Sequence, residues 1–263
     1  TATITTDDTL TVYASGYDAG TNYIGLVDVT WSQTGTLSPA PSGTSQSFAF
    51  DPDVPGSGTI DADHATATDD STGTITVNLG AESYIGITTT LGGSNAIAGS
   101  SFDIMLTVYD GDDNVKTDFT GAHNVDWTVS GANNAPDSTV PTLPSDGNMT
   151  FALGVVTYSN AVLVNGTDSV EIKAELTVEG VNEDTPLVVD CDPGTADHFT
   201  VETENSGVET AGIDFEVTVT VYDAYDNLVD HGVNDYDGLH TIDFTHTATA
   251  SPNATSPVIP ASI

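Results

Sequence analysis

The sequence has almost no basic residues. Its 263 residues include 39 Asp and Glu but only two Lys or Arg, which gives a formal net charge of -37 at pH 7. A surplus of negative charge this large repels the phosphates of nucleic acids and of anionic membranes. No apolar run approaches the roughly 20 residues that cross a bilayer. We therefore expect no nucleic-acid partner and no direct insertion into a membrane.

Cysteine and the motifs of enzymes are also scarce. The single cysteine, Cys191, excludes an internal disulfide. The six histidines lack H-x-x-x-H spacing, and neither a G-x-S-x-G elbow nor a phosphate-binding glycine loop occurs. Because no pattern predicts a catalytic site, we expect that the protein is not an enzyme.

Helical signals are missing as well. No segment has a sustained 3.6-residue apolar period, whereas Gly, Thr and Ser are abundant and 30 of the 39 acids are Asp. Asp favours turns and caps over helix interiors. Short alternating segments separated by Gly, Asp, Asn and Pro predict an all-β protein. The length suits two to three domains of about 100 residues each.

One segment of the chain occurs twice. Residues 98–110, AGSSFDIMLTVYD, align without gaps on residues 211–223, AGIDFEVTVTVYD, with seven of thirteen positions identical. Both alternate as half-buried strands do, and each runs into an acidic turn, DGDDN or DAYDN. A strand with an aromatic is expected after each turn, around Trp127 and around Phe244. The chain is therefore predicted to be an array of modules.

A weaker third copy begins the chain. Residues 9–18, TLTVYASGYD, fit the same frame 96 residues before the middle copy. In this alignment Thr6 and Asp8 stand where the middle copy has Phe102 and Ile104. The opening strand of the first copy is therefore expected to be atypical, displaced or incomplete.

These landmarks predict three tandem β-sandwich domains: residues 1–83, 84–194 and 195–263. Within the middle domain, the dipeptide Asn165-Gly166 lies between two alternating runs and predicts a β-hairpin. The last domain is apparently incomplete, because only nineteen residues follow Phe244. Either the sequence is a fragment of a longer array, or a neighbouring subunit supplies strands, with residues 1–8 as candidate donor. The alternative is that residues 1–8 form the first strand of the first domain.

The stretch AGIDFEVTVTVYDAYDNLV, followed by a Gly and a strand with an aromatic, resembles a known class of repeat. It is similar to the immunoglobulin-like repeat modules of bacterial and archaeal cell-surface proteins, including invasin and intimin-like adhesins and surface-layer-associated or filament proteins. The turn in those families often reads DAYGN, whereas this chain has Asp113 and Asp226 at the Gly position. The resemblance implies an immunoglobulin-like sandwich that serves as a spacer, filament or adhesive stalk outside the cell.

The acidic turns are candidate calcium sites. Calcium takes about 6 to 8 oxygen ligands, which closely spaced Asp residues can supply, although neither turn fits the EF-hand pattern. Solvated acidic loops, suited to salty or divalent-rich water, are the alternative. The candidate ligands are Asp110, Asp112, Asp113, Asp118, Asp223, Asp226, Asp230, Asp235 and Asp237.

Three sequons predict glycans on an extracellular chain: Asn148, Asn165 and Asn253.

The sequence thus favours a structural subunit of an extracellular surface assembly, a filament, sheath or surface layer, that associates with identical subunits. One alternative is an adhesin stalk or a carbohydrate-binding module for surface glycans, with Tyr17, Tyr23, Tyr225 and Tyr236 as the exposed aromatics it would need. Another is an accessory fragment of a larger secreted protein. Trp31 and Trp127 are expected to pack inward.

Overall fold

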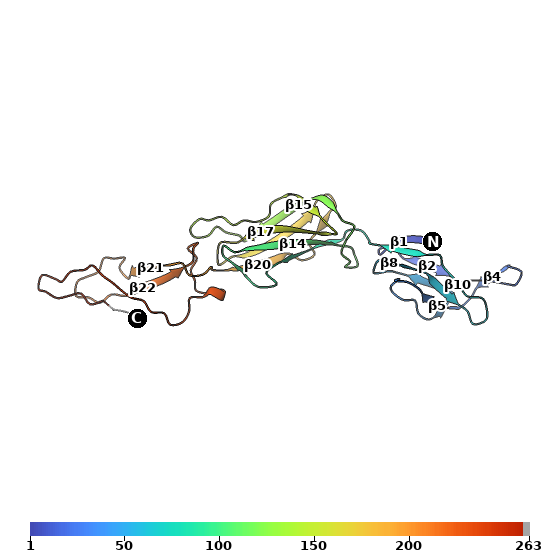
Figure 1. Ribbon diagram of the computed structural model, residues 1–263, viewed down its shortest axis with the longest axis horizontal. Helices are drawn as coiled ribbons and strands as arrows, with labels where there is room; N and C mark the ends of the chain where they lie inside the picture. The colour runs from blue at the N-terminus through green and yellow to red at the C-terminus, as the bar shows by residue number, and fades with distance from the viewer. Residues whose placement is uncertain (260–263) are drawn as a thin grey trace.

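The computed structural model describes residues 1–259, so the last four residues of the predicted third domain lie outside the described part. Three modules follow one another along the long axis of the molecule, from the blue N-terminal end to the red C-terminal end (Figure 1). The only helix among the described residues is the short 3-10 helix η1, Gly232–Asn234. The predicted all-β class is confirmed. Within residues 1–259, no helix is long and apolar enough to cross a membrane.

The first module consists of short strands that surround a single core. β1, β11 and β8 form one sheet, β10, β9, β5 and β6 form another, and the pairs β2–β7 and β3–β4 complete it. Trp31, predicted to pack inward, is 4% exposed and lies in this core with Phe50 and Ile60. The strands are β1 (Ala2–Thr5), β2 (Leu10–Tyr13), β3 (Ser15–Tyr17), β4 (Tyr23–Leu26), β5 (Val29–Gln33), β6 (Thr44–Ser45), β7 (Ser47–Phe50), β8 (Gly56–Gly58), β9 (Ile60–Asp63), β10 (Asp70–Ser71) and β11 (Ile75–Asn78).

The second module is a complete sandwich of two sheets. One sheet has the order β12-β14-β17, and the other has the order β13-β20-β18-β15-β16, with β19 beside β18. Its strands are β12 (Tyr84–Thr89), β13 (Ala96–Ile97), β14 (Ser101–Tyr109), β15 (Gly121–Ser130), β16 (Gly147–Phe151), β17 (Val155–Val162), β18 (Ser169–Leu176), β19 (Val181–Asn182) and β20 (Leu187–Asp192).

Period-two alternation builds the core of the second module. The apolar face predicted for residues 98–110 is buried along β14, as is Trp127 on β15 opposite it. Burying a large aliphatic side chain stabilises a fold by about 1.5–3 kcal/mol, so this strand alone contributes a substantial share of the core. The β14 residues that face the core are Phe102, Ile104, Leu106 and Val108.

The Asn165-Gly166 dipeptide does not form the predicted hairpin. β17, before it, pairs with β14, whereas β18, after it, pairs with β15 and β20 in the other sheet. The connection therefore crosses from one sheet to the other. Residues 154–178 alternate as a hairpin would, because inward-facing residues alternate equally well in two strands that face each other across a sandwich.

The third module contains one strand pair, β21 (His198–Thr203) and β22 (Val217–Tyr222). Phe199 pairs with Val221 and Val201 with Val219, so these side chains share a face. Phe199 is nevertheless 60% exposed, and both hydrophobic cores among residues 1–259 lie in the other two modules. The strand predicted around Phe244 does not form there. In the second module the corresponding strand β15 pairs with β16 and β18, and residues 1–259 include no counterparts of those two strands in the third module.

The first two modules share a plan that corrects the alignment of the first copy. β1 runs parallel to β11, as β13 does to β20. The next residue then makes the same bond: the Thr6 N–H donates to the Asn78 carbonyl at 3.0 Å, and the Ala98 N–H donates to the Asp192 carbonyl at 2.9 Å. Thr6 therefore corresponds to Ala98, an offset of 92 residues rather than 96. Thr6 and Asp8 do not replace Phe102 and Ile104.

The shift arises because the first copy is four residues shorter between its acidic turn and Trp31. An ungapped comparison anchored on Trp31 therefore misplaced the preceding strand. Residues 1–8 were the candidate strand donor for the incomplete last domain, but residues 2–5 form β1 and pair within the first module. The structure thus places this segment as the first strand of its own module.

Candidate functional site

Each linker between modules meets an aspartate-centred turn of the module that follows. These Asp turns, residues 110–114 and 223–227, share the pattern Asp-x-x-x-Asn. Asp110 and Asp223 are both 0% exposed, and a buried charge is tolerated only when it is paired or hydrogen-bonded. We call the contact between residues 78–81 and the turn at 110–114 the first joint, and that between residues 192–195 and the turn at 223–227 the second joint.

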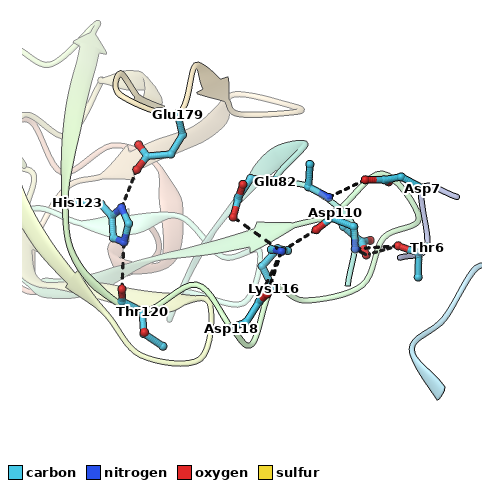
Figure 2. A network of polar contacts seen from close by, with 11 residues as sticks. Thr6, Asp7, Glu82, Asp110, Lys116, Asp118, Thr120, His123 and Glu179 are labelled. Atoms are coloured by element: carbon cyan, nitrogen blue, oxygen red, sulfur yellow. Dashed lines mark hydrogen bonds and ion pairs between the residues drawn. The ribbon is translucent and has the colours of Figure 1, made fainter. Parts of the chain in front are cut away.

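At the first joint, one oxygen of Asp110 closes its own turn and the other binds the preceding module. Oδ1 accepts the backbone N–H groups of Asp112 at 3.1 Å and Asn114 at 2.9 Å. Oδ2 accepts the N–H of Gly80 at 3.2 Å and the hydroxyl of Thr6 at 2.9 Å (Figure 2). One buried carboxylate thus connects two modules.

Two further side chains of the second module hold the first joint. The amide nitrogen of Asn114 donates to the carbonyl of Asp53 in the first module at 2.9 Å. Lys116, only 4% exposed, donates from Nζ to the carbonyl of Gly80 at 2.6 Å and pairs with Asp118 at 3.1 Å. Gly80 is therefore held at its N–H by a carboxylate and at its carbonyl by an ammonium group.

The environment of Asp110 keeps it charged. Burial raises the pKa of its carboxyl, but hydrogen bonds from Asn114, Thr6 and Asp112 lower the pKa more, so the net value lies below the ordinary 3.8. Hydrogen bonds to an ionised acceptor are roughly twice as strong as those between neutral groups. The first joint is therefore held by charge-assisted bonds at neutral pH.

The second joint repeats this arrangement. Oδ1 of Asp223 accepts the N–H groups of Tyr225 at 2.8 Å and Asn227 at 2.9 Å. Oδ2 accepts the N–H of the linker glycine Gly194 at 2.7 Å. Asp223 therefore does for the second joint what Asp110 does for the first.

Asn227 and His231 attach the third module to the loop between β17 and β18. The Asn227 amide donates to the Val164 carbonyl at 2.8 Å and accepts the Gly166 N–H at 3.0 Å. His231 Nε2 lies 2.8 Å from the Gly166 carbonyl, and Nδ1 lies 2.7 Å from Asp230. The hydrogen bond to Asp230 raises the pKa of His231, burial opposes this, and the Gly166 carbonyl adds to it. The protonated ring can donate at both nitrogens.

Tyr225 covers the second joint and packs against the core of the second module. Gly99 lies beneath it with φ at +79°, and a Cβ there would come within 2.3 Å of the Tyr225 ring. Only glycine suits this left-handed position and leaves room for the ring. Tyr225 is thus an anchor between modules rather than the free aromatic that a glycan site would need.

The paired roles of Asp and Asn were not anticipated from the sequence, where these acids were considered as metal ligands. A signal was present, because Asp and Asn keep their places in DGDDN and DAYDN while the three residues between them differ in two positions. An Asp side chain that accepts N–H groups two and four residues later closes a turn, and an Asn at the fourth position is free to reach outward.

The predicted calcium ligands are not brought together. Among residues 1–259, no group of three or more His, Cys, Asp or Glu side chains is arranged to hold a metal. Asp110 and Asp223 do not fit a cation, because N–H and O–H donors already point at their oxygens. Asp118 pairs with Lys116, Asp113 accepts the Tyr84 hydroxyl, Asp226 pairs with His198 and Asp230 with His231, while Asp112, Asp235 and Asp237 are exposed.

The three predicted glycosylation sites differ in surroundings. Asn148 is exposed on β16, and Asn253 is exposed near the end of the described chain. Asn165 is half-buried, and its amide nitrogen donates to the Asn134 carbonyl at 3.1 Å. A glycan on Asn165 would replace one hydrogen of that amide, so Asn148 and Asn253 stay the better predicted sites.

The remaining candidate aromatics lie at the two ends of the molecule. Tyr17 and Tyr23 face each other edge-on at 5.9 Å in the first module and are 61% and 59% exposed. Tyr236 stacks on His240 at 3.9 Å in the third module. The first pair is the more open of the two, since Tyr236 is 44% exposed.

Comparison with known proteins finds weak similarities. No protein-family model matches the chain, and no curated protein matches it. Among solved structures, the Escherichia coli adhesin FdeC is 18% identical with a TM-score of 0.38, over 84% of this chain and 70% of FdeC. Domains 4–9 of the surface layer protein SbsC are 16% identical with a TM-score of 0.25, over 90% of this chain and 34% of that one.

A third similar structure is a chimeric titin Z1Z2 tandem, 10% identical with a TM-score of 0.22, over 73% of this chain and 94% of the tandem. One of the three is named an adhesin and another a surface layer protein.

Proposed function

We propose that the chain is an extended structural segment of an extracellular surface assembly, in which sandwich modules are fixed end to end at hydrogen-bonded joints. The observation that carries the proposal is the repetition of one contact at both joints. A linker glycine donates its N–H to a fully buried aspartate at 3.2 Å in the first joint and at 2.7 Å in the second.

Several features support a rigid connection over a flexible tether. Flexible linkers are rich in exposed Gly and Ser, whereas Gly80 and Gly194 are buried. Each turn also sends an Asn amide to a carbonyl of the preceding module, Asp53 or Val164. Two separate points of contact resist both bending and rotation, which is what a spacer that transmits force or sets a distance requires.

Composition supports work in salty or divalent-rich water. A net charge of -37 would cause strong self-repulsion at low ionic strength, and salt screens it over a Debye length of about 8 Å at 0.15 M. Calcium stays a prediction, restricted to acids outside the joint hydrogen bonds, such as Asp112, Asp235 and Asp237.

The proposal is tested by electron microscopy and light scattering of material from the native source, with calcium and after chelation. Filaments or sheets built from this chain would support a structural subunit, and their loss on chelation would support calcium between subunits. Particles of a single chain's mass under both conditions would contradict the assembly.

A second candidate function is recognition of surface glycans by Tyr17 and Tyr23. Exposed aromatic rings can stack on sugar faces, and Tyr13, 62% exposed, lies on the neighbouring strand β2. A glycan array with the full chain tests this candidate. Binding that Tyr23→Ala removes would favour the adhesive function, and no binding to any glycan would count against it.

A further inference from the structure

The first module carries the same Asp turn as the joints, but no linker within residues 1–259 lies on it. Oδ1 of Asp18 accepts the N–H groups of Gly20 and Asn22, both at 2.9 Å, as Oδ1 of Asp110 and Asp223 do in their turns. The pKa of Asp18 is lowered by the side-chain and backbone hydrogen bonds of Asn22 and by the N–H of Gly20. Asp18 is nevertheless exposed, whereas both joint aspartates are 0% exposed. Oδ2 of Asp18 accepts the Asn22 side-chain amide at 3.0 Å, as Oδ2 of Asp110 and Oδ2 of Asp223 accept the amides of Asn114 and Asn227. Those two oxygens also accept a linker glycine N–H, and among residues 1–259 Oδ2 of Asp18 has no such second donor.

The strand beside this turn also lacks a neighbour. In the second module, β14 lies between β12 and β17. Among residues 1–259, the corresponding β2 of the first module pairs only with β7, and β3 pairs only with β4. The edge that β12 occupies in the second module is therefore open. β12 brings Ile85 and Ile87 into the core there, at 0% and 9% exposure.

An aromatic stack is missing at the same place. In the second module Tyr84, four residues after linker Gly80, stacks on Tyr109 at 4.9 Å. In the third module His198, four residues after Gly194, stacks on Tyr222 at 5.5 Å. Both stacking partners directly precede the Asp of the turn.

Tyr17 has that position in the first module, directly before Asp18, and it is 61% exposed with only the edge of Tyr23 against it. The turn, the strand edge and the aromatic platform thus all lack the same neighbour.

We propose that the edge of β2 and β3 accepts an extended strand from a preceding sandwich module of the same kind. The strand carries a glycine whose N–H binds Oδ2 of Asp18 and an aromatic four residues later that stacks on Tyr17. Two β-branched or aromatic side chains then enter the first core, as Ile85 and Ile87 do in the second. This inference extends the proposed function, because it makes the first module a third joint of the same array.

Fluorescence anisotropy with a labelled peptide of residues 78–90, NLGAESYIGITTT, tests the proposal on the full chain. The two filled joints hold their own strands, so we expect saturable binding of one peptide per chain. Asp18→Ala should weaken binding roughly tenfold or more, because a hydrogen bond to a charged group is lost. The matched control Asp28→Ala removes an exposed acid of the same module and should leave the affinity within about twofold.

A second peptide with N-methylglycine in place of Gly80 lacks the N–H and should bind as weakly as the first peptide binds the Asp18→Ala chain. Absence of saturable binding, or equal affinity for the wild-type and Asp18→Ala chains, would overturn the proposal. Equal affinity of both peptides would overturn the glycine contact and with it the joint. These readings use dissolved single chains, so they succeed or fail independently of whether native material forms an assembly.

The source of the strand is tested by sedimentation of the chain alone. A preceding module as the source predicts that the chain without peptide stays monomeric. The chain alone could instead form dimers that dissociate when the peptide is added and that do not form in Asp18→Ala. That result would identify the bound strand as part of a second copy of this chain and would contradict a preceding module as its source.

Discussion

Replacing Asp110 with Asn removes the charge at the first joint and keeps the size of the side chain. The carboxylate oxygens accept bonds from Thr6, Gly80, Asp112 and Asn114. An amide has only one acceptor oxygen, and its NH2 group would face N–H or O–H donors. At least one buried donor then loses its partner.

The expected cost follows from those donors. Leaving a buried donor or acceptor unsatisfied costs about 1–3 kcal/mol. The Gly80 N–H keeps its 2.9 Å bond to Thr6 Oγ1, so the buried donor at risk is the Thr6 hydroxyl. We therefore expect Asp110→Asn to lower the free energy of unfolding by about 1–3 kcal/mol. The control Asp112→Asn makes the same charge change two positions away at an exposed residue and should cost about 0.5 kcal/mol or less.

The two tryptophans allow the modules to be followed separately. Trp31 lies in the first core and Trp127 in the second, and they are the only tryptophans in the chain. Urea unfolding followed by fluorescence in Trp31→Phe and Trp127→Phe backgrounds reports each module in turn. Asp110→Asn should lower the midpoint of the second module and, through Thr6 and Gly80, that of the first.

A loss for Asp110→Asn no larger than that for Asp112→Asn would refute this reasoning. Such a result would mean that water replaces the linker contacts at no cost. The joint would then be a consequence of chain connectivity rather than a source of rigidity.

Three other predictions concern titration and reactivity. Because the folded chain lowers the pKa of Asp110, the ionised carboxylate contributes its full stabilisation above the ordinary pKa, and this stabilisation is lost as the pH falls through the lower folded pKa. In urea unfolding from pH 2 to 7, the difference in free energy of unfolding between Asp110→Asn and wild type should therefore vanish only in strong acid. The pKa of His231 is raised in the folded chain, so the protonated ring contributes its full stabilisation below about pH 6.5, and this stabilisation is lost as the pH rises through the folded pKa. His231→Gln should abolish this pH dependence of the free energy of unfolding, followed by NMR. Burial raises the pKa of the Cys191 thiol to about 12, so a thiolate-directed reagent should label it at pH 8 only after denaturation, and rapid labelling of the native chain would contradict the buried position.

Alternation predicted the all-β class and the inward-facing side chains. The apolar face of β14 and the inward Trp31 and Trp127 follow from period-two patterning, which depends on local sequence. The Asn165-Gly166 hairpin was wrong because that signal is also local, and it does not distinguish a turn within one sheet from a crossing between two sheets. The choice is made by β15 and β20, which pair with β18 from distant positions in the chain.

The joints could not be predicted in the same way. A cluster of acids indicates charge but not burial, and Asp110 is buried only because a linker thirty residues earlier lies across it. Lys116, one of two lysines in the chain, gave no sequence signal for its contact with the Gly80 carbonyl. The sequence does contain the shared Asp and Asn of the two turns. Their role in the joints can be assigned only when their hydrogen-bond partners in the preceding module are known.

Small-angle X-ray scattering of the full chain tests most directly whether the Asp turns fix the modules end to end. The variant Asp110→Asn/Asp223→Asn is compared with Asp112→Asn/Asp226→Asn, which makes the same charge change in the same two turns. The account predicts an extended particle for the wild type and the control, and a shorter mean dimension with a broader distance distribution for the joint variant. Identical scattering curves from all three proteins, with the modules still folded, would contradict it.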